Sequence, residues 1–465
     1  MFAGEVINTT EGRQVLHVLL RAEASDGLSP LVEDVLRVKQ QVKAFAHAVR
    51  SGEKVGVTGK PLVNTLCIGI GGSYLGPEFV AEALRTEPNA AAQATNRRLR
   101  FLANVDPVDF IRATSDLDPE ETLVVIISKT FTTAETMMNA RKVKQWLLKG
   151  IQGHEEAAII AAHMSAVSTN LQKTAEFGIN ESSVFGFWDW VGGRYSVTSA
   201  VGLLPLYLQY GDVIDEFLAG AREVDQDFLT KANSENAKTS IPIVLGLIGW
   251  WNTQYLNYSS RAVLPYSQAL VRFAAHVQQL DMESNGKQCT SSGEPISVSG
   301  PIVFGEPGTN GQHSFYQLLH QGRTVPAEFI GFCRSHSFDT EAHVELMCNF
   351  FAQADALALG KSVADLQAES CPAALLAHKS FTGDRPSLSL LFTELSPKAC
   401  GQLLAFYEHR VAVEGFLWGI NSFDQYGVEL GKVLAQGVKK VLASKDLTGQ
   451  VSETLLGHFI AHKLN

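Results

Sequence analysis

The stretch NTLCIGIGGSYLG, residues 64–76, decides the class of fold that this chain builds. Its first residues, 64–70, form a short apolar run typical of a buried strand, and residues 77–84 carry a helical pattern. The glycine-rich segment 69–76 lies at the junction. A strand, a glycine loop and a helix in that order predict a phosphate-binding unit, because small residues let backbone N–H groups approach an anion at a helix N-terminus.

The same loop matches the dinucleotide-binding fingerprint poorly. With Gly69 and Gly71 as the first two glycines of that fingerprint, Tyr74 occupies the third glycine position. We therefore expect no nicotinamide cofactor.

Apolar runs and helical patterns alternate in the residues that follow. Residues 99–103 and 122–128 read as two more buried strands, and helical patterns follow them at 107–113 and 134–148. Alternation of this kind predicts the α/β class, with a parallel sheet flanked by helices in three layers. Ligands of such sheets bind at the strand ends that lead into helices.

The loop SKTFTTAET, residues 128–136, begins at such a strand end and is rich in hydroxyl groups. Serine and threonine before a helix commonly do no more than cap its N-terminus. Together with the 69–76 loop of the same sheet, however, they offer many neutral donors to one phosphate group. Both interpretations remain open from the residues alone.

A polar connection at residues 233–239 separates this half from a second α/β unit. We place a first domain at 31–232 and a second at 240–442, with residues 1–30 and 443–465 as flanking segments that pack on them. The other expected helices are 31–50, 198–210, 213–231, 343–359, 398–411 and 428–442, and the other expected strands are 161–168, 261–265, 302–304, 328–333 and 388–392.

Glu283 and Arg194 are the first candidates for chemistry. Glu283 lies in QQLDMESNGK, residues 278–287, where we expect a helix to stop near Leu280 and leave the acid in a loop open to substrate. Arg194 follows two glycines in VGGRYS, residues 191–196, which suggests a guanidinium brought close to a ligand. The plainer interpretations are a solvated loop acid and a structural ion pair.

His313 and Lys432 are the next candidates. His313 lies where a glycine-flanked turn, GTNGQHSF at residues 308–315, leads into a helix, and only histidine titrates near neutrality without special tuning. Lys432 is either solvated or directed toward the preceding loop, residues 421–427. His343 and Glu345 have no third ligand nearby, so we expect a polar helix face and no metal.

The composition excludes several classes of protein. The 38 basic and 48 acidic residues give a net charge of -10 and a pI near 5.7, and no basic tract favours nucleic acid. The six cysteines are scattered, so we expect reduced thiols. Residues 1–13 lack a signal-peptide pattern, and the longest apolar run, 241–251, is too short to span a bilayer. We expect a soluble, cytoplasmic protein.

Five segments resemble the hallmark stretches of the glucose-6-phosphate isomerase family, in the same order and at suitable intervals. They are SKTFTTAET, DWVGGRYSV, QQLDMESNGK, GTNGQHSFYQLLHQG and NSFDQYGVELGK. The sequence outside these segments is most similar to the cytosolic plant and protist branch of the family. The resemblance implies two sugar-isomerase (SIS) domains with five-stranded parallel sheets. It also implies an aldose–ketose isomerase that needs no cofactor and no metal and acts on a hexose 6-phosphate as a homodimer.

Roles for individual residues follow from the same resemblance. Glu283 is expected to be the proton-shuttling base, Arg194 to lie beside the reacting carbons, and His313 to open the sugar ring with help from Lys432, reaching into the neighbouring subunit's site. The residues expected to bind substrate are Gly72, Ser73, Ser128, Lys129, Thr130, Phe131, Thr132, Thr133, Thr136, Gly193, Gln279 and Gln425.

The chemistry explains these residue types. Moving a proton between carbons 2 and 1 through a cis-enediol requires one carboxylate base, and a guanidinium that cannot lose its proton suits the developing negative charge. A non-catalytic sugar-phosphate sensor would have no reason to retain all four of Glu283, Arg194, His313 and Lys432. A signalling role leaves no recognisable mark in the sequence.

Overall fold

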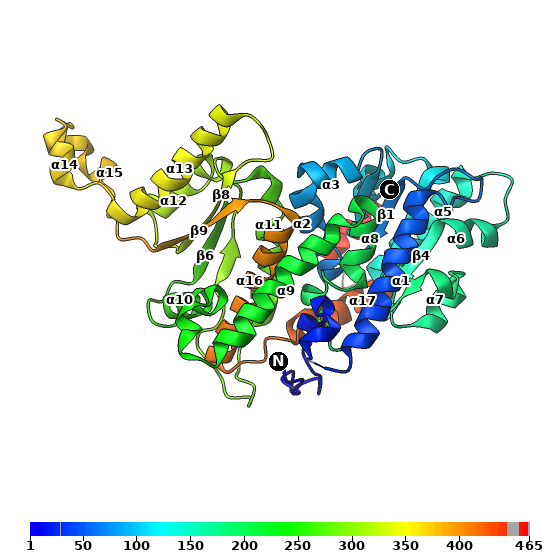
Figure 1. Cartoon of the computed structure of the whole chain (residues 1–465). Helices are drawn as coiled ribbons and strands as arrows, with labels where there is room; N and C mark the ends of the chain where they lie inside the picture. The colour runs from blue at the N-terminus through cyan, green and yellow to red at the C-terminus, as the bar shows by residue number, and fades with distance from the viewer. Residues whose placement is uncertain (28, 444–454, 464–465) are drawn as a thin grey trace. The chain divides into compact units, whose positions relative to one another are not determined.

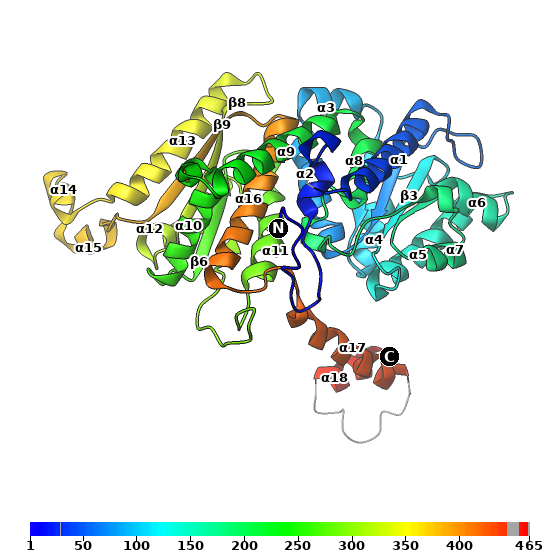
Figure 2. The same cartoon turned by 60° about the horizontal axis from the view of Figure 1, so that its bottom comes forward.

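The computed structural model describes residues 1–27, 29–443 and 455–463, and the chain divides into two compact units, residues 1–422 and 423–465. The first unit contains two parallel sheets with their helices (Figure 1). The second contains a short 3-10 helix, η11 (Tyr426–Val428), with α17 (Glu429–Ala443) and α18 (Leu455–Lys463) (Figure 2). Much of the predicted flanking segment 443–465 lies outside the described residues.

The first sheet has the strand order β2-β1-β3-β4-β5, and all neighbouring strands are parallel. Its strands are β1 (Asn64–Ile68), β2 (Arg98–Leu102), β3 (Thr122–Ile127), β4 (Met164–Val167) and β5 (Val184–Phe185). Every residue of β1, β3 and β4 is buried, because helices cover both faces of a parallel sheet. The apolar runs at residues 64–70 and 122–128 therefore predicted β1 and β3 correctly, whereas β5 was not predicted.

The helices of this half form where the sequence repeats apolar residues at helical spacing. In α1 (Val32–Ser51), Val35, Val38, Val42 and Val49 are buried, and the helix ends at Gly52 in the left-handed conformation that glycine favours. The other helices are α2 (Leu75–Leu84), α3 (Pro88–Gln93), α4 (Pro107–Thr114), α5 (Ala134–Gly150), α6 (Glu156–His163), α7 (Leu171–Phe177), α8 (Ala200–Tyr210) and α9 (Val213–Ala232).

The strand expected at residues 161–168 is shorter than predicted. Residues 161–163 belong to the end of α6, and β4 begins at Met164. The reason is a tertiary contact, since the His163 ring lies 2.9 Å from the Thr122 carbonyl oxygen and accepts a hydrogen bond from the Val57 N–H at 3.0 Å. These contacts fix His163 at the helix end.

The second sheet has the order β7-β6-β8-β9, again all parallel. Its strands are β6 (Ser260–Pro265), β7 (Ile302–Phe304), β8 (Ala327–Arg334) and β9 (Ser387–Glu394). The described residues give this sheet four strands, where the family resemblance implied five. Both sheets lie within the spans assigned to the two domains, 31–232 and 240–442, whose boundaries stay a prediction.

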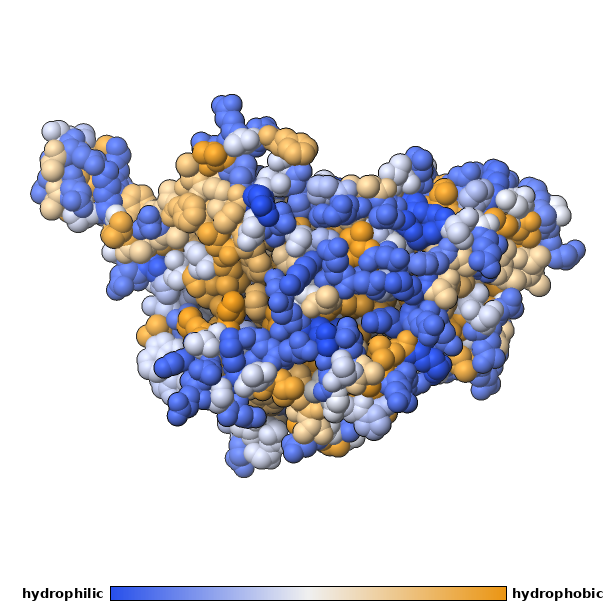
Figure 3. Space-filling view, viewed as in Figure 1, coloured by the Kyte–Doolittle hydropathy of each residue, from blue (hydrophilic) through white to orange (hydrophobic). Residues whose placement is uncertain are grey.

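Helices cover this sheet less completely. They are α10 (Ile241–Gln254), α11 (Phe273–Asn285), α12 (Tyr316–Gln321), α13 (Thr340–Leu359), α14 (Val363–Ala368), α15 (Leu376–Lys379) and α16 (Pro397–Trp418). α16 is buried along most of its length and packs against α9, α10 and α11. Figure 3 shows hydrophobic residues at the surface in the region of α13 and β9. Val344 and Phe351 of α13 and Leu391 of β9 are exposed. The second sheet thus keeps an apolar surface that the first sheet buries.

The helix before Glu283 is longer than predicted. We expected it to stop near Leu280, but α11 continues to Asn285, which places Glu283 inside its last turn. Ser284 and Asn285 are fully buried, and the Asn285 Nδ2 donates to the Val411 carbonyl oxygen at 3.2 Å. Hydrogen bonds to distant segments therefore outweigh the local turn preference of these residues.

Two predictions about the whole chain can be compared with the described residues. None of the helices that the structure describes is both long enough and apolar enough to cross a membrane. All six cysteines are free thiols, as expected. Burial raises the pKa of the Cys67 and Cys400 thiols, so these two are unreactive core residues.

Candidate active site

The glycine loop after β1 lies directly against the loop that carries Arg194. Residues 71–73 form a 3-10 helix, η3 (Gly71–Ser73), and residues 193–195 form another, η6 (Gly193–Tyr195). A Cβ atom placed on Gly72 would lie 2.1 Å from the carbonyl carbon of Gly193 and 2.7 Å from the Arg194 nitrogen. Only glycine permits this approach, so Gly72 fixes how closely the two loops meet.

Arg194 is buried and held in one orientation. Its Nε donates to Ser284 Oγ at 2.6 Å, and its Nη2 donates to the Ser422 carbonyl oxygen at 2.5 Å. The Tyr195 hydroxyl lies 3.1 Å from the same Ser284 oxygen. Burial raises the pKa of Tyr195 to about 12, so its hydroxyl keeps its proton. These contacts leave Nη1 directed at Glu283, whose Oε1 is 3.7 Å away.

Glu283 lies between Arg194 and Gln279. Gln279 precedes it by one helical turn, and the Gln279 Nε2 donates to Glu283 Oε2 at 2.9 Å. The Glu283 side chain keeps 21% of its surface exposed, whereas that of Arg194 keeps 1%. The carboxylate is therefore oriented by two neighbours and still open to a small molecule, which is what a base that removes a proton needs.

The Ser128 loop begins where β3 ends, beside the end of β1. Ser128 is buried, and its Oγ donates to Thr133 Oγ1 at 3.3 Å. Phe131 has a left-handed backbone (φ 54°) and a buried ring. This turn leaves Thr130 and Thr132 with their hydroxyl oxygens 2.6 Å apart at the surface. Hydroxyl groups thus converge at the carboxyl ends of two neighbouring strands, the position at which parallel sheets bind ligands.

Two other residues of this loop are less accessible. The Lys129 Nζ donates to the carbonyl oxygens of Asp189 at 3.1 Å and Val191 at 3.4 Å, so it ties this loop to the segment before Arg194. Burial lowers the pKa of Lys129. Thr136 is buried, and its hydroxyl has no hydrogen-bond partner among the described residues.

Three predicted residues, His313, Gln425 and Lys432, come from other segments of the chain. His313 ends the 3-10 helix η9 (Asn310–His313) and is exposed. No hydrogen bond or ion pair joins its side chain to any residue that the structure describes, Glu283 included. Gln425 and Lys432 belong to the second compact unit, where Gln425 precedes η11 and Lys432 lies in α17.

Ser284 and Tyr195 were missed by the sequence analysis. Both hold Arg194 in place, and each is adjacent in sequence to a residue that had been singled out. Their position next to Arg194 and Glu283 in the sequence was the only sign of this role, because a serine and a tyrosine that become buried cannot be told from ordinary core residues by sequence.

The fold and this cluster define an α/β protein with a small-molecule site at the carboxyl ends of parallel strands. The family model described as Phosphoglucose isomerase matches residues 1–454 of the chain. The chain therefore belongs to the phosphoglucose isomerase family, as the hallmark segments had indicated.

Known relatives are similar to this chain over nearly all of its length. The cytosolic glucose-6-phosphate isomerase of Zea mays is 54% identical, with 100% of this chain and 84% of the relative covered. The cytosolic glucose-6-phosphate isomerase of Arabidopsis thaliana is also 54% identical, with 97% and 82% covered. Among solved structures, a glucose-6-phosphate isomerase from Chlamydia trachomatis is 34% identical, with a TM-score of 0.79 and coverage of 98% and 82%.

Proposed function

We propose that this chain interconverts glucose 6-phosphate and fructose 6-phosphate, a reversible step shared by glycolysis and gluconeogenesis. The observation that carries the proposal is the Glu283 carboxylate, which Gln279 and Arg194 hold in place while it stays accessible. Family membership and the names of relatives that are 54% identical supply the reaction. The same names support a cytosolic location for this chain.

The site chemistry suits an aldose–ketose isomerisation. Glu283 removes a proton from carbon 2 and returns it to carbon 1, so one base serves both half-reactions through a cis-enediol. Negative charge develops on the oxygens of the enediolate. The Arg194 guanidinium, buried and already oriented by Ser284, stabilises that charge without reorganising.

The two loops at the ends of β1 and β3 are proposed to bind the phosphate. Gly72 and Ser73 contribute the η3 turn, and the Ser128 loop contributes the hydroxyl groups of Thr130, Thr132 and Thr133. Neutral donors of this kind bind a phosphate dianion through directed hydrogen bonds. Gln425 is proposed to complete the sugar pocket.

Ring opening is proposed to involve a second copy of the chain. The substrate is mainly a closed ring, and a group that titrates near neutrality must move a proton between the ring oxygen and the carbon 1 hydroxyl. We assign this role to His313 of the neighbouring subunit of a homodimer, assisted by Lys432. His313 is exposed and has no bonding partner in the described part of its own chain, which supports an action elsewhere.

A coupled assay that converts fructose 6-phosphate into glucose 6-phosphate tests the proposed activity. Removal of the base in Glu283→Gln should lower turnover by on the order of a hundred-fold or more. The exposed loop residue Glu53 provides a matched control, because Glu53→Gln makes the same chemical change away from the cluster. A near-normal rate for Glu283→Gln would exclude it as the base.

The shared site has its own test. A Glu283→Gln chain mixed with a His313→Ala chain forms some heterodimers in which one site has both intact residues. We expect the mixture to regain activity above either variant alone. If activity stays at the level of the separate variants, His313 does not act across a subunit interface.

A further inference from the structure

The two sheets of this chain repeat one winding pattern. In each sheet the second strand along the chain lies at an edge, the first strand lies next to it, and the third and fourth follow on the other side. The chain therefore reverses its direction of winding between β1 and β3, and again between β6 and β8. At such a reversal the loops diverge and leave a crevice beyond the carboxyl ends of the two strands.

The local elements at the two crevices also correspond. β1 leads through the 3-10 helix η3 into α2, and β6 leads through the 3-10 helix η8 (Gln268–Leu270) into α11. On the other side, β3 and β8 lead through loops that begin with Ser128 and Ser335 into α5 and α13. The first crevice holds the proposed phosphate loops, and the second has no part in the isomerase site described above.

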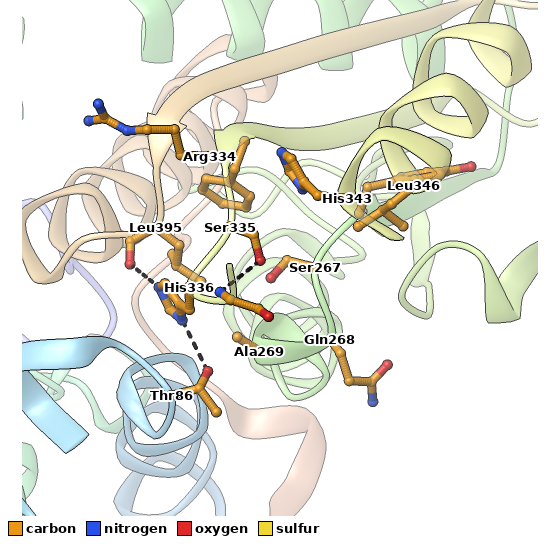
Figure 4. A pocket seen from close by; sticks show the side chains of 13 residues that line it. Thr86, Ser267, Gln268, Ala269, Arg334, Ser335, His336, His343, Leu346 and Leu395 are labelled. Carbon is orange, nitrogen blue, oxygen red and sulfur yellow. Dashed lines mark hydrogen bonds between the residues drawn. The ribbon is translucent and has the colours of Figure 1, made fainter. Parts of the chain in front are cut away.

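The second crevice contains a cavity of about 340 Å³ (Figure 4). Its thirteen lining residues, all of them described, include five hydroxyl side chains, one amide, one arginine and two histidines, and none of them is acidic. The polar members are Thr86, Tyr266, Ser267, Gln268, Arg334, Ser335, His336, Ser337 and His343. In a chain of net charge -10, a hollow that combines basic groups with hydroxyls and lacks carboxylates favours an anion.

The two histidines are held at the wall of this cavity. The His336 Nε2 lies 2.7 Å from the Leu395 carbonyl oxygen and its Nδ1 lies 3.0 Å from Thr86 Oγ1, so it links the two halves of the first unit. The His343 Nε2 lies 3.1 Å from the Cys333 carbonyl oxygen, to which it donates. Its Nδ1 is the other ring nitrogen, and it can donate to an anion only in a ring that carries a hydrogen on both nitrogens. In Figure 4 the His343 side chain lies above the Ser335 and Ser267 hydroxyls.

Arg334 adds charge at the rim. Its Nη2 lies 3.1 Å from Glu394 Oε2, and its side chain is 63% exposed. Glu394 offsets part of the positive charge, so the hydroxyl groups are the main donors. The N-terminus of α13, which begins at Thr340 beside this loop, is capped by the Asp339 carboxylate, which accepts from the Ala342 N–H at 3.0 Å, so this helix end adds little positive charge to the cavity.

We propose that this crevice is a second anion site, which binds the phosphate group of a small phosphorylated metabolite or free phosphate. Hydroxyls and cations without a carboxylate suit phosphate and do not suit a metal ion. The cavity volume falls at the lower end of the range for small-molecule pockets, which leaves room for a phosphate and a short carbon chain. The proposal does not depend on the isomerase activity.

A pair of matched variants tests it. The Ser335 Oγ accepts a hydrogen bond from the N–H two residues later, at 3.1 Å, and aspartate makes the same turn. Ser335→Asp therefore puts a carboxylate at the cavity with little change in the loop. Ser234 makes the same contact with the Asn236 N–H at 3.2 Å and is exposed outside the cavity lining, so Ser234→Asp adds the same charge elsewhere.

Equilibrium dialysis against inorganic phosphate gives the readout. Ser335→Asp should bind one phosphate fewer per chain than Ser234→Asp and the unchanged protein, while inhibition of the isomerase reaction by phosphate stays the same. Equal phosphate binding by the two variants would overturn the proposal. The melting temperature of each variant shows whether it is folded. His343→Gln, which removes the Nδ1 atom, should weaken the binding of the same phosphate by about three-fold.

A second experiment distinguishes a phosphorylated metabolite from free phosphate as the ligand. Glycerol 1-phosphate is titrated against bound inorganic phosphate in the unchanged protein and in Ser335→Asp. If the ester displaces the Ser335-dependent phosphate at a lower concentration than phosphate itself, the ligand is a phosphorylated metabolite. If it displaces only at a higher concentration, the site is one for free phosphate.

Discussion

Replacement of Gly72 by alanine tests the contact between the two loops. The added methyl group would lie 2.1 Å from the Gly193 carbonyl carbon and 2.2 Å from its oxygen. Both neighbours are backbone atoms, so no side-chain rotation can relieve the overlap. The Gly193 segment would have to withdraw by about 1.3 Å to reach an ordinary van der Waals distance.

A displacement of the Gly193 backbone by this distance would also move Arg194. Arg194 follows Gly193, and its Nε to Ser284 Oγ bond of 2.6 Å would lengthen beyond hydrogen-bonding range. Misplacement of a positioned group by about 1 Å costs on the order of a hundred-fold in rate. We expect Gly72→Ala to lower kcat/KM by about that factor and the free energy of unfolding by about 1–3 kcal/mol.

The coupled isomerase assay and urea unfolding measure the two effects. Gly186→Ala is the matched control, because a Cβ atom at Gly186 meets no atom within 4 Å and its backbone is not left-handed. That variant should stay within about two-fold of the normal rate, as is usual for surface changes. A Gly72→Ala enzyme with normal activity and stability would refute the inference that this contact sets the position of Arg194.

Three further outcomes are expected. Ser284→Ala removes the acceptor for the Arg194 Nε and should lower kcat about ten-fold with little change in KM, measured by steady-state kinetics. Burial lowers the pKa of His276 to about 4. The unfolded chain therefore binds one more proton than the folded chain between pH 6.5 and 4, and the free energy of unfolding should fall by about 3 kcal/mol as the pH drops through that range. Urea unfolding of His276→Phe should lack this pH dependence. Arg261→Met leaves the buried Asp281 carboxylate without its ion-pair partner, although Glu414 keeps Arg410 at 3.1 Å, and should cost about 3–5 kcal/mol in the same measurement.

Local patterns predicted most of the elements. The apolar runs at β1 and β3 and the spacing of valines in α1 follow from side-chain periodicity, which neighbouring residues determine. Boundaries were less accurate where a distant contact intervened. α11 runs to Asn285 because buried partners satisfy its last side chains, and β4 starts late because His163 is fixed by Thr122.

The sequence likewise predicted one part of the candidate site, its residues, and not the other, their orientation. Glu283 and Arg194 were candidates in the sequence because an acid past an expected helix end and an arginine after two glycines can meet a ligand, and the family resemblance supplied their roles. The sequence did not show how Glu283 and Arg194 are oriented toward each other, because that orientation depends on Gln279, Ser284 and Tyr195 together. No spacing rule links residues from a loop after one sheet to a helix of the other.

The sequence by itself determined the parallel α/β architecture, the family and the residue types available for chemistry, because these depend on local periodicity and on contiguous motifs. Only the tertiary structure decided that Gly72 meets Gly193, that Glu283 sits in a helical turn against Arg194, and that a second crevice repeats the position of the first. Those features arise from packing between segments far apart in the chain, and such packing is fixed by the fit of side chains and backbone in three dimensions.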